Sequence, residues 1–193
     1  MYNFSFKGFH HLAMATNDID TTVRFWRDLL GMKLVLTMGE DGRRMYFFEV
    51  SGVNMLAFFE WPEVERVPYK VPGVPVKGPF MMDHVSFELG SMDELWNLAE
   101  RLIAAGFFMS NVMDHGMVKA FYTFDPNGMP IEFCVEDEDL DLRGEPRMLD
   151  ENPSGTAREG FEPDPHRWPT PEEGRNPDER IVLPGKGKDR FNR

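Results

Sequence analysis

The chain has 193 residues, 41% of them hydrophobic, and a formal net charge of −12 at pH 7. This composition allows one good core or two small modules that share one, and the negative charge argues against nucleic acid or an anionic membrane as a partner. The sequence has no apolar run of the roughly 20 residues that span a membrane, no signal-peptide pattern, and a single cysteine, so we expect a soluble cytoplasmic protein without disulfides.

The first predicted module spans residues 8–62. A short strand, HLAMAT, begins at His11 and is followed by a helix that ends at a glycine. Apolar residues at helical spacing give this helix one buried stripe: Val23, Trp26 and Leu30. Three strand-like runs follow it, MKLVLTM, RRMYFFEV and NMLAFFEW. The module therefore has the order β-α-β-β-β.

A proline-rich linker, residues 62–80, separates this module from a second one, residues 80–135. Each proline removes a backbone donor and disfavours helix at the preceding residue, so we expect the linker to be extended. The second module repeats the first: HVSFEL begins at His84, a capped helix follows, and three more strand-like runs complete it. The sequence thus contains an internal repeat with a period of about 73 residues.

The tail, residues 136–193, is rich in proline and charge and has no sustained apolar period. Such a segment cannot form a core of its own. Its apolar points, Phe161, Trp168 and the run IVLP at 181–184, are expected to dock on the body or on a second subunit.

Two histidines and one carboxylate suggest a metal site. His11 and His84 are the first residues of equivalent predicted strands, and the residues that share a strand face with them are small or polar. Glu132 lies in the last hairpin of the second module. Two imidazoles and a carboxylate form a facial ligand set that leaves positions open on an ion such as Fe(II). A histidine at a strand start is more often structural, as we expect for His10, but the equivalent positions of the other two favour ligands.

The first module has no carboxylate at the position of Glu132. Aligning GVNMLAF with NGMPIEF places Ala57 there, and Glu60 lies three residues further on, with the wrong parity for that face. We therefore expect three protein ligands.

The stretches HHLAMATNDIDTTVRFWRDLLGMKL, HVSFEL and DPNGMPIEF resemble the vicinal oxygen chelate superfamily, which includes glyoxalases, fosfomycin-resistance enzymes and extradiol ring-cleavage dioxygenases. The resemblance covers residues 8–135. It implies an α+β fold whose paired β-α-β-β-β modules form a cupped mixed sheet around a divalent metal held by His11, His84 and Glu132. Fe(II) is the first expectation for this metal, with Mn(II), Zn(II) or Ni(II) as alternatives. We also expect a small-molecule substrate and a homo-oligomer.

Within that superfamily, HGMVKAFYTFDPNGMPIE is similar to the extradiol dioxygenase signature, from which only the opening position, Met113, departs. The likeness implies that His115 lies next to the metal ligands without binding the metal itself, and that Tyr122 hydrogen-bonds to a substrate-derived oxygen. Asn54 stands where many extradiol enzymes carry an acid–base histidine, and an amide cannot take a catechol proton. Either His115 or Tyr122 takes over that task, or the reaction is not catechol cleavage.

Three functions are consistent with these observations. The first is an extradiol-type dioxygenase that cleaves a catechol-like aromatic diol with O₂. The second is a glyoxalase-like lyase, isomerase or epimerase that acts on a small carbonyl or enediolate substrate, and it requires a strong base beside the metal. The third is a drug-sequestering binding protein, which the intact ligand set disfavours.

Overall fold

The computed structural model describes residues 5–40, 43–78, 82–168, 176, 178, 180–185 and 191. The chain divides into a body that ends at Glu145 and a C-terminal segment that begins at Pro146. Residues 79–81, where the expected linker meets the second module, and most of the tail beyond 168 lie outside the described residues.

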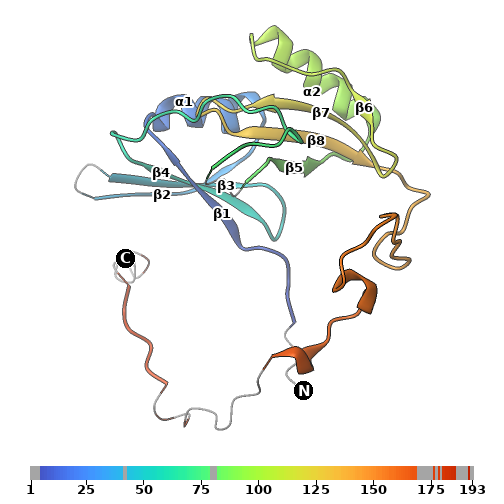
Figure 1. The fold of residues 1–193 in the computed structure, drawn as a ribbon. Coiled ribbons are helices and arrows are strands. Elements are labelled where there is room, and N and C mark those ends of the chain that lie inside the picture. Colours follow the sequence, from blue (N-terminus) through green and yellow to red (C-terminus); the bar gives the residue numbers. More distant parts are fainter. Residues whose placement is uncertain are drawn as a thin grey trace. The chain divides into compact units, whose positions relative to one another are not determined.

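Each module of the body forms one four-stranded mixed sheet (Figure 1). The first has the order β1-β4-β3-β2 and the second the order β5-β8-β7-β6, and in each the first and last strands of the module pair in parallel. The elements of the first module are β1 (His11–Thr16), α1 (Ile19–Val23), the π-helical η1 (Arg24–Leu29), β2 (Leu34–Glu40), β3 (Arg43–Glu49) and β4 (Met55–Glu60). Those of the second are β5 (Val85–Glu88), α2 (Met92–Ala104), β6 (Met113–Asp114), β7 (Val118–Phe124) and β8 (Pro130–Glu136). The predicted α+β fold of paired β-α-β-β-β modules is confirmed.

Local signals in the sequence fix where the two helices begin and end. Asp18 accepts a hydrogen bond from the Thr21 amide at 3.0 Å, and Ser91 accepts one from the Glu94 amide at 3.2 Å. These side chains satisfy amides that have no partner within the helix. Gly31 and Gly106 follow the helices with φ of +80° and +81°, the left-handed conformation that glycine adopts without strain.

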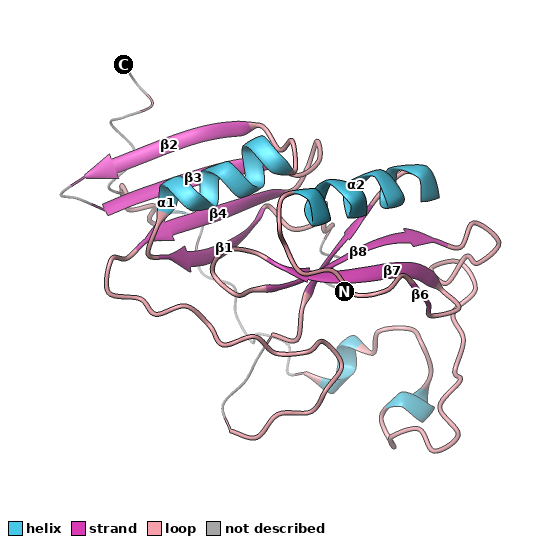
Figure 2. Cartoon of the chain, turned by 90° about the horizontal axis from the view of Figure 1, so that it is seen from above, coloured by secondary structure: helices cyan, strands magenta, loops and turns pink. Residues whose placement is uncertain are grey.

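One hydrophobic core joins the two modules. Both helices lie on the same side of the sheets (Figure 2), and Trp26 of η1, which is fully buried, contacts Phe58 of β4 and Phe87 of β5, each with ring centroids 5.7 Å apart. A buried aromatic side chain removes about 150–250 Å² from water, worth about 4–6 kcal/mol at 25 cal/mol per Å² as an upper bound. Trp26 therefore holds the modules together in the body.

The strand register shows which side chains are neighbours across the paired strands. Ala13 pairs with Ala57 across β1 and β4, and Ser86 pairs with Glu132 across β5 and β8. Ala57 is thus the structural counterpart of Glu132, as the alignment of the two halves indicated. Glu60 accepts a hydrogen bond from the Ile19 amide at 3.2 Å, so its carboxylate caps the first helix.

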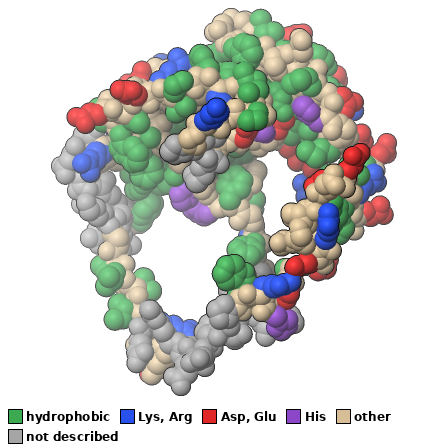
Figure 3. All heavy atoms as spheres, in the orientation of Figure 1, with side chains coloured by type: hydrophobic (Ala, Val, Ile, Leu, Met, Phe, Trp, Pro, Cys, Tyr) green, Lys and Arg blue, Asp and Glu red, His purple; other side chains and the backbone are tan. Residues whose placement is uncertain are grey.

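The C-terminal segment contains two short 3₁₀ turns among its described residues, η2 (Ala157–Glu159) and η3 (Pro165–Arg167). The apolar points expected to dock are exposed: Phe161 by 55%, Trp168 by 80% and Ile181 by 78%. On the face drawn in Figure 3, Lys and Arg side chains lie scattered among Asp and Glu. Within the described part of the chain, no helix is long and apolar enough to cross a membrane.

Candidate functional site

The β7–β8 hairpin brings Tyr122 and Glu132 together. The two residues are direct partners in the register, and the Tyr122 hydroxyl donates to Glu132 Oε1 at 2.6 Å. Glu132 is only 7% exposed. A buried carboxylate is costly unless hydrogen bonds or charges compensate it, so its position in the middle of a sheet depends on partners such as Tyr122.

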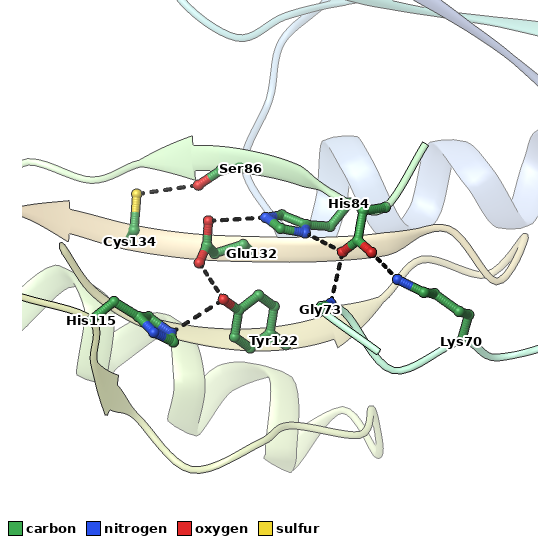
Figure 4. A network of polar contacts seen from close by, with 9 residues as sticks. Lys70, Gly73, His84, Ser86, His115, Tyr122, Glu132 and Cys134 are labelled. Atoms are coloured by element: carbon green, nitrogen blue, oxygen red, sulfur yellow. Dashed lines mark hydrogen bonds and ion pairs between the residues drawn. The ribbon is translucent and has the colours of Figure 1, made fainter. Parts of the chain in front are cut away.

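His84, just before β5, is the second partner of Glu132. Its Nε2 lies 3.4 Å from Glu132 Oε2, and its Nδ1 lies 2.7 Å from Asp83 Oδ1 (Figure 4). Asp83 presents only acceptors, so Nδ1 carries the proton and donates. Nε2 then faces the Glu132 oxygen across a short gap, where a proton or a cation is needed between them.

The spacing of these two atoms fits a shared metal ion. Bonds of about 2.0–2.2 Å from a metal to imidazole nitrogen and carboxylate oxygen place neighbouring donors about 3.0–3.4 Å apart. The separation of 3.4 Å between His84 Nε2 and Glu132 Oε2 lies at the upper end of that range. His84 and Glu132 are therefore spaced as two donors of a facial ligand set would be.

His11, the third expected ligand, is not brought to this pair. Its Nδ1 lies 2.8 Å from His10 Nδ1, and its ring packs edge-on against Phe47, with centroids 5.3 Å apart. In the described part of the chain, no three His, Cys, Asp or Glu side chains are grouped so that they could hold a metal. A single copy of the chain thus presents an incomplete ligand set.

His115, between β6 and β7, extends the network on the other side of Tyr122. Its Nε2 lies 3.2 Å from the Tyr122 oxygen. Because the Tyr122 O–H is already donated to Glu132, the imidazole N–H must be the donor in this contact. The result is a chain of hydrogen bonds from exposed His115 through Tyr122 to buried Glu132. Burial of the phenol, and then its bond to Glu132, raise the pKa of Tyr122 well above the usual 10.0.

Asn54 lies apart from this network, in the turn between β3 and β4. Its Nδ2 donates to Ser51 Oγ at 3.3 Å, and its buried Oδ1 has no hydrogen-bond partner. The backbone amide of the next residue, Met55, donates to the carbonyl of His10. Asn54 is therefore close in the fold to the strand that carries His11.

Three residues that sequence analysis did not single out complete the site. Asp83 accepts from His84, from the Gly73 amide at 2.9 Å and from the Lys70 ammonium. The Lys70 contact above all, followed by His84 and Gly73, lowers the pKa of Asp83 far below its usual 3.8. The dipeptide Asp-His at 83–84 was the available signal for Asp83, but nothing in the linker sequence pointed to Lys70 or Gly73.

A further polar pair lies beside Glu132 on the same face. Ser86 Oγ is 3.3 Å from Cys134 Sγ (Figure 4). Burial raises the pKa of the Cys134 thiol. This pair adds small, neutral polar groups next to the candidate metal position.

The model of the Glyoxalase/Bleomycin resistance protein/Dioxygenase superfamily matches residues 8–133. The chain belongs to this superfamily. Its members include enzymes of several reaction types, so the match fixes the fold family and not the reaction.

Solved structures agree with this assignment. A glyoxylase/bleomycin resistance protein/dioxygenase domain from Frankia sp. EAN1pec is 21% identical, with a TM-score of 0.58 over 69% of this chain and 100% of that one. The fosfomycin resistance protein FosX from Listeria monocytogenes is 16% identical, with a TM-score of 0.51 over 70% and 98% of the two chains. Lactoylglutathione lyase from Agrobacterium tumefaciens is 24% identical, with a TM-score of 0.50 over 67% and 93%. At these identities the likeness shows the fold alone.

Proposed function

We propose that the protein is a divalent-metal-dependent enzyme of the extradiol type, which cleaves a catechol-like aromatic diol with O₂. The observation that carries this proposal is the chain of hydrogen bonds from His115 through Tyr122 to Glu132, next to His84. It combines two candidate ligands with groups that hold and move protons at an oxygen atom. Such a combination is needed where a diol is deprotonated beside a metal.

The metal would be held by His84 Nε2, Glu132 and a histidine from the first module, His11. Fe(II) is the first candidate, with Mn(II), Zn(II) or Ni(II) as alternatives. One solved FosX structure contains Mn(II) with 1S,2S-dihydroxypropylphosphonic acid, at 14% identity and a TM-score of 0.54. When bound, a divalent ion would lower the pKa of a substrate hydroxyl and hold the diol close to O₂.

The side chains would handle the protons. Because its pKa is raised, Tyr122 keeps its O–H at neutral pH. The hydroxyl donates to Glu132 in the free protein and would turn to a negatively charged oxygen of the substrate when the substrate is bound. His115 contacts that hydroxyl and is exposed, so it can exchange a proton between the site and solvent. In the overall reaction a ring carbon–carbon bond breaks and both atoms of O₂ enter the product. The ring supplies the electrons that reduce O₂, so no further reductant is needed.

We further propose that the protein is a homo-oligomer in which His11 of a second copy completes the ligand set. His11 occupies the position of the first module that corresponds to His84, yet it does not join His84 and Glu132 within one chain. Asn54, which is close in the fold to the strand that carries His11, would also line the shared site.

Mixing two inactive variants tests this arrangement. His11→Ala and Glu132→Ala should each bind little metal. If the ligands come from two copies, random reassembly of a two-site dimer restores up to about one quarter of the sites, because half of the dimers are mixed and each carries one intact site. No recovery in a mixture that exchanges subunits would contradict the proposal.

Asn54 favours a second candidate, a lyase, isomerase or epimerase that acts on a small carbonyl or enediolate substrate. An amide can bind an oxygen atom but cannot accept its proton. This alternative requires a base beside the metal, and Glu88, an exposed carboxylate that pairs with Cys134 two residues along the strand from Glu132, is the candidate.

Metal content is the first test of the proposed function. Protein purified without oxygen should contain close to one divalent ion per chain, and Glu132→Ala should lose it while remaining folded. Glu136→Gln is a matched control, because Glu136 lies four residues along the same strand and pairs with Arg143. Full metal occupancy in Glu132→Ala would refute the ligand assignment.

Oxygen consumption then separates the two reactions. We expect the Fe(II) or Mn(II) form to consume one O₂ per molecule of some catechol in a panel of substituted catechols. Absence of uptake with every catechol, in protein that holds its metal, would favour the lyase or isomerase alternative.

A further inference from the structure

The linker between the modules makes specific contacts at the candidate metal centre. Lys70, whose side chain is only 10% exposed, forms an ion pair with Asp83 Oδ2. The Gly73 amide donates to Asp83 Oδ1 at 2.9 Å, and the same oxygen accepts from His84 Nδ1 at 2.7 Å. Figure 4 shows Lys70 and Gly73 of the linker and His84 around one carboxylate, and Glu132 next to the other nitrogen of His84.

Asp83 is therefore fixed by its own partners before it acts on His84. A carboxylate with a single partner can rotate among several positions. Here one oxygen is held by an ammonium and the other by a backbone amide, so the acceptor for His84 Nδ1 has a defined place. Holding the proton on Nδ1 leaves Nε2 as the lone-pair donor, and it also fixes the plane of the ring.

We propose that Asp83, held by Lys70 and Gly73 of the linker, is the positioning residue that directs His84 Nε2 toward the metal. The inference rests on the proposed metal centre. It assigns the linker a role beyond connecting the modules, since its conformation sets how well His84 is presented. Carboxylates behind a ligating histidine typically change metal affinity by about 10–100-fold when removed.

A series of variants separates the contributions. Asp83→Ala removes the acceptor and should weaken Mn(II) binding by about 10–100-fold. Asp83→Asn keeps an oxygen acceptor without the charge and should have a smaller effect. Lys70→Met keeps the length of the side chain but removes the ammonium, so it should also weaken binding by less than Asp83→Ala.

Two matched controls should leave Mn(II) affinity unchanged. Lys77→Met removes an exposed lysine from the same linker. Asp137→Asn alters a carboxylate that also accepts a backbone amide, that of Asp139 at 3.0 Å, but does so in a turn after β8. Mn(II) affinity is measured from the electron paramagnetic resonance signal of the free ion during titration of the full-length chain.

The second measurement does not require metal. Ring ¹⁵N chemical shifts of His84 in the metal-free protein report which nitrogen carries the proton. We expect Nδ1 to be protonated in the native chain, with a shift toward the Nε2-protonated form in Asp83→Ala. A role of Asp83 in general stability alone would not move this equilibrium.

The outcomes distinguish this inference from the proposed function. If the native chain binds no Mn(II), the proposed metal centre fails, and the ¹⁵N shifts alone decide whether Asp83 sets the tautomer of His84. If Asp83→Ala leaves either the His84 shifts or a measurable Mn(II) affinity unchanged, the positioning role is refuted. A lower affinity in both Asp83→Ala and Lys70→Met, with both controls unchanged, supports it.

Discussion

The two modules share one fold but carry different chemistry. At the position where the second module has Glu132, the first has Ala57, and both side chains are buried in the middle of a parallel strand pair. Phe47 is the first-module strand partner of Ala57, at the place where Tyr122 pairs with Glu132 in the second module. The first module therefore presents His11 between His10 and the apolar Phe47. The second presents a connected polar network.

This difference indicates a division of labour between the two repeated modules. The backbone register is the same in both, so it sets where a side chain points but not what it does. The neighbouring antiparallel strand places Phe47 next to Ala57 and Tyr122 next to Glu132. Only the buried carboxylate needs a hydrogen-bond donor, and Tyr122 supplies it. We therefore expect catalytic defects to concentrate in the second module and stability to depend on both.

The largest effect is expected for His115→Ala. Loss of the group that links Tyr122 to solvent should lower kcat by a general acid–base factor of about 10²–10⁴, with metal content unchanged because His115 is not a proposed ligand. Steady-state turnover and elemental analysis measure the two quantities. His166→Ala, which removes a histidine from the C-terminal segment, is the control. Unaltered turnover in His115→Ala would remove the dioxygenase proposal.

Trp26→Ala tests whether the modules are one cooperative unit. Deleting this buried side chain should lower the free energy of unfolding by about 3–5 kcal/mol, because it leaves a cavity that both sheets line. Urea unfolding followed by circular dichroism should still show a single transition. Trp96→Ala, at a 48% exposed position on α2, should change stability by no more than about 0.5 kcal/mol. Two separate transitions in Trp26→Ala would show that the modules unfold independently.

Tyr122→Phe should have a smaller effect than His115→Ala. It removes one hydrogen bond to a charged group, worth about 1.5–3 kcal/mol, and keeps the ring, so kcat should fall by about 10–100-fold. Tyr46→Phe is the matched change in the first module and should leave turnover unchanged. A loss in Tyr46→Phe as large as that in Tyr122→Phe would contradict the division of labour.

Alkaline titration should distinguish Tyr122 from the other tyrosines. Its folded pKa is raised, so the neutral phenol contributes stability that is complete below the unfolded value of 10.0 and is lost as pH rises through the folded pKa. Absorbance at about 295 nm should show one late-ionising tyrosine that is missing in Tyr122→Phe. Between about pH 9 and 11, the native chain should lose slightly more stability than the variant.

The smallest effect is expected for the tail, residues 136–193, which includes the C-terminal segment. Its exposed apolar residues, such as Trp168 and Ile181, are of the kind that gain by burial against another surface. We predict that residues 136–193 pack as an extended arm on the body or on a second copy, so limited proteolysis should cut them more slowly than a free peptide of the same sequence. Equal rates, with no change in assembly after cleavage, would contradict this prediction.

The sequence by itself determined the repeat, the order of elements and much of the second module's site. Helix caps, closing glycines and strand alternation are local signals, and they were sufficient to predict both β-α-β-β-β units and the equivalence of Ala57 with Glu132. The turn DPNG has a defined length, so the contact between Tyr122 and Glu132 also followed from local geometry. Among the expected site residues, His84 and His115 join that pair in the structure.

Only the tertiary structure decided how the distant parts meet. Trp26 of η1 packs on Phe58 of the first sheet and Phe87 of the second. In this packing of one chain, His11 does not form a ligand group with His84 and Glu132. For the linker, the sequence predicts only an extended backbone, because prolines constrain the backbone locally. Where an extended chain passes depends on contacts with residues far along the sequence, and only the fold revealed that Lys70 and Gly73 hold Asp83 behind His84. Local propensity does not encode such long-range contacts, since they depend on how whole elements pack.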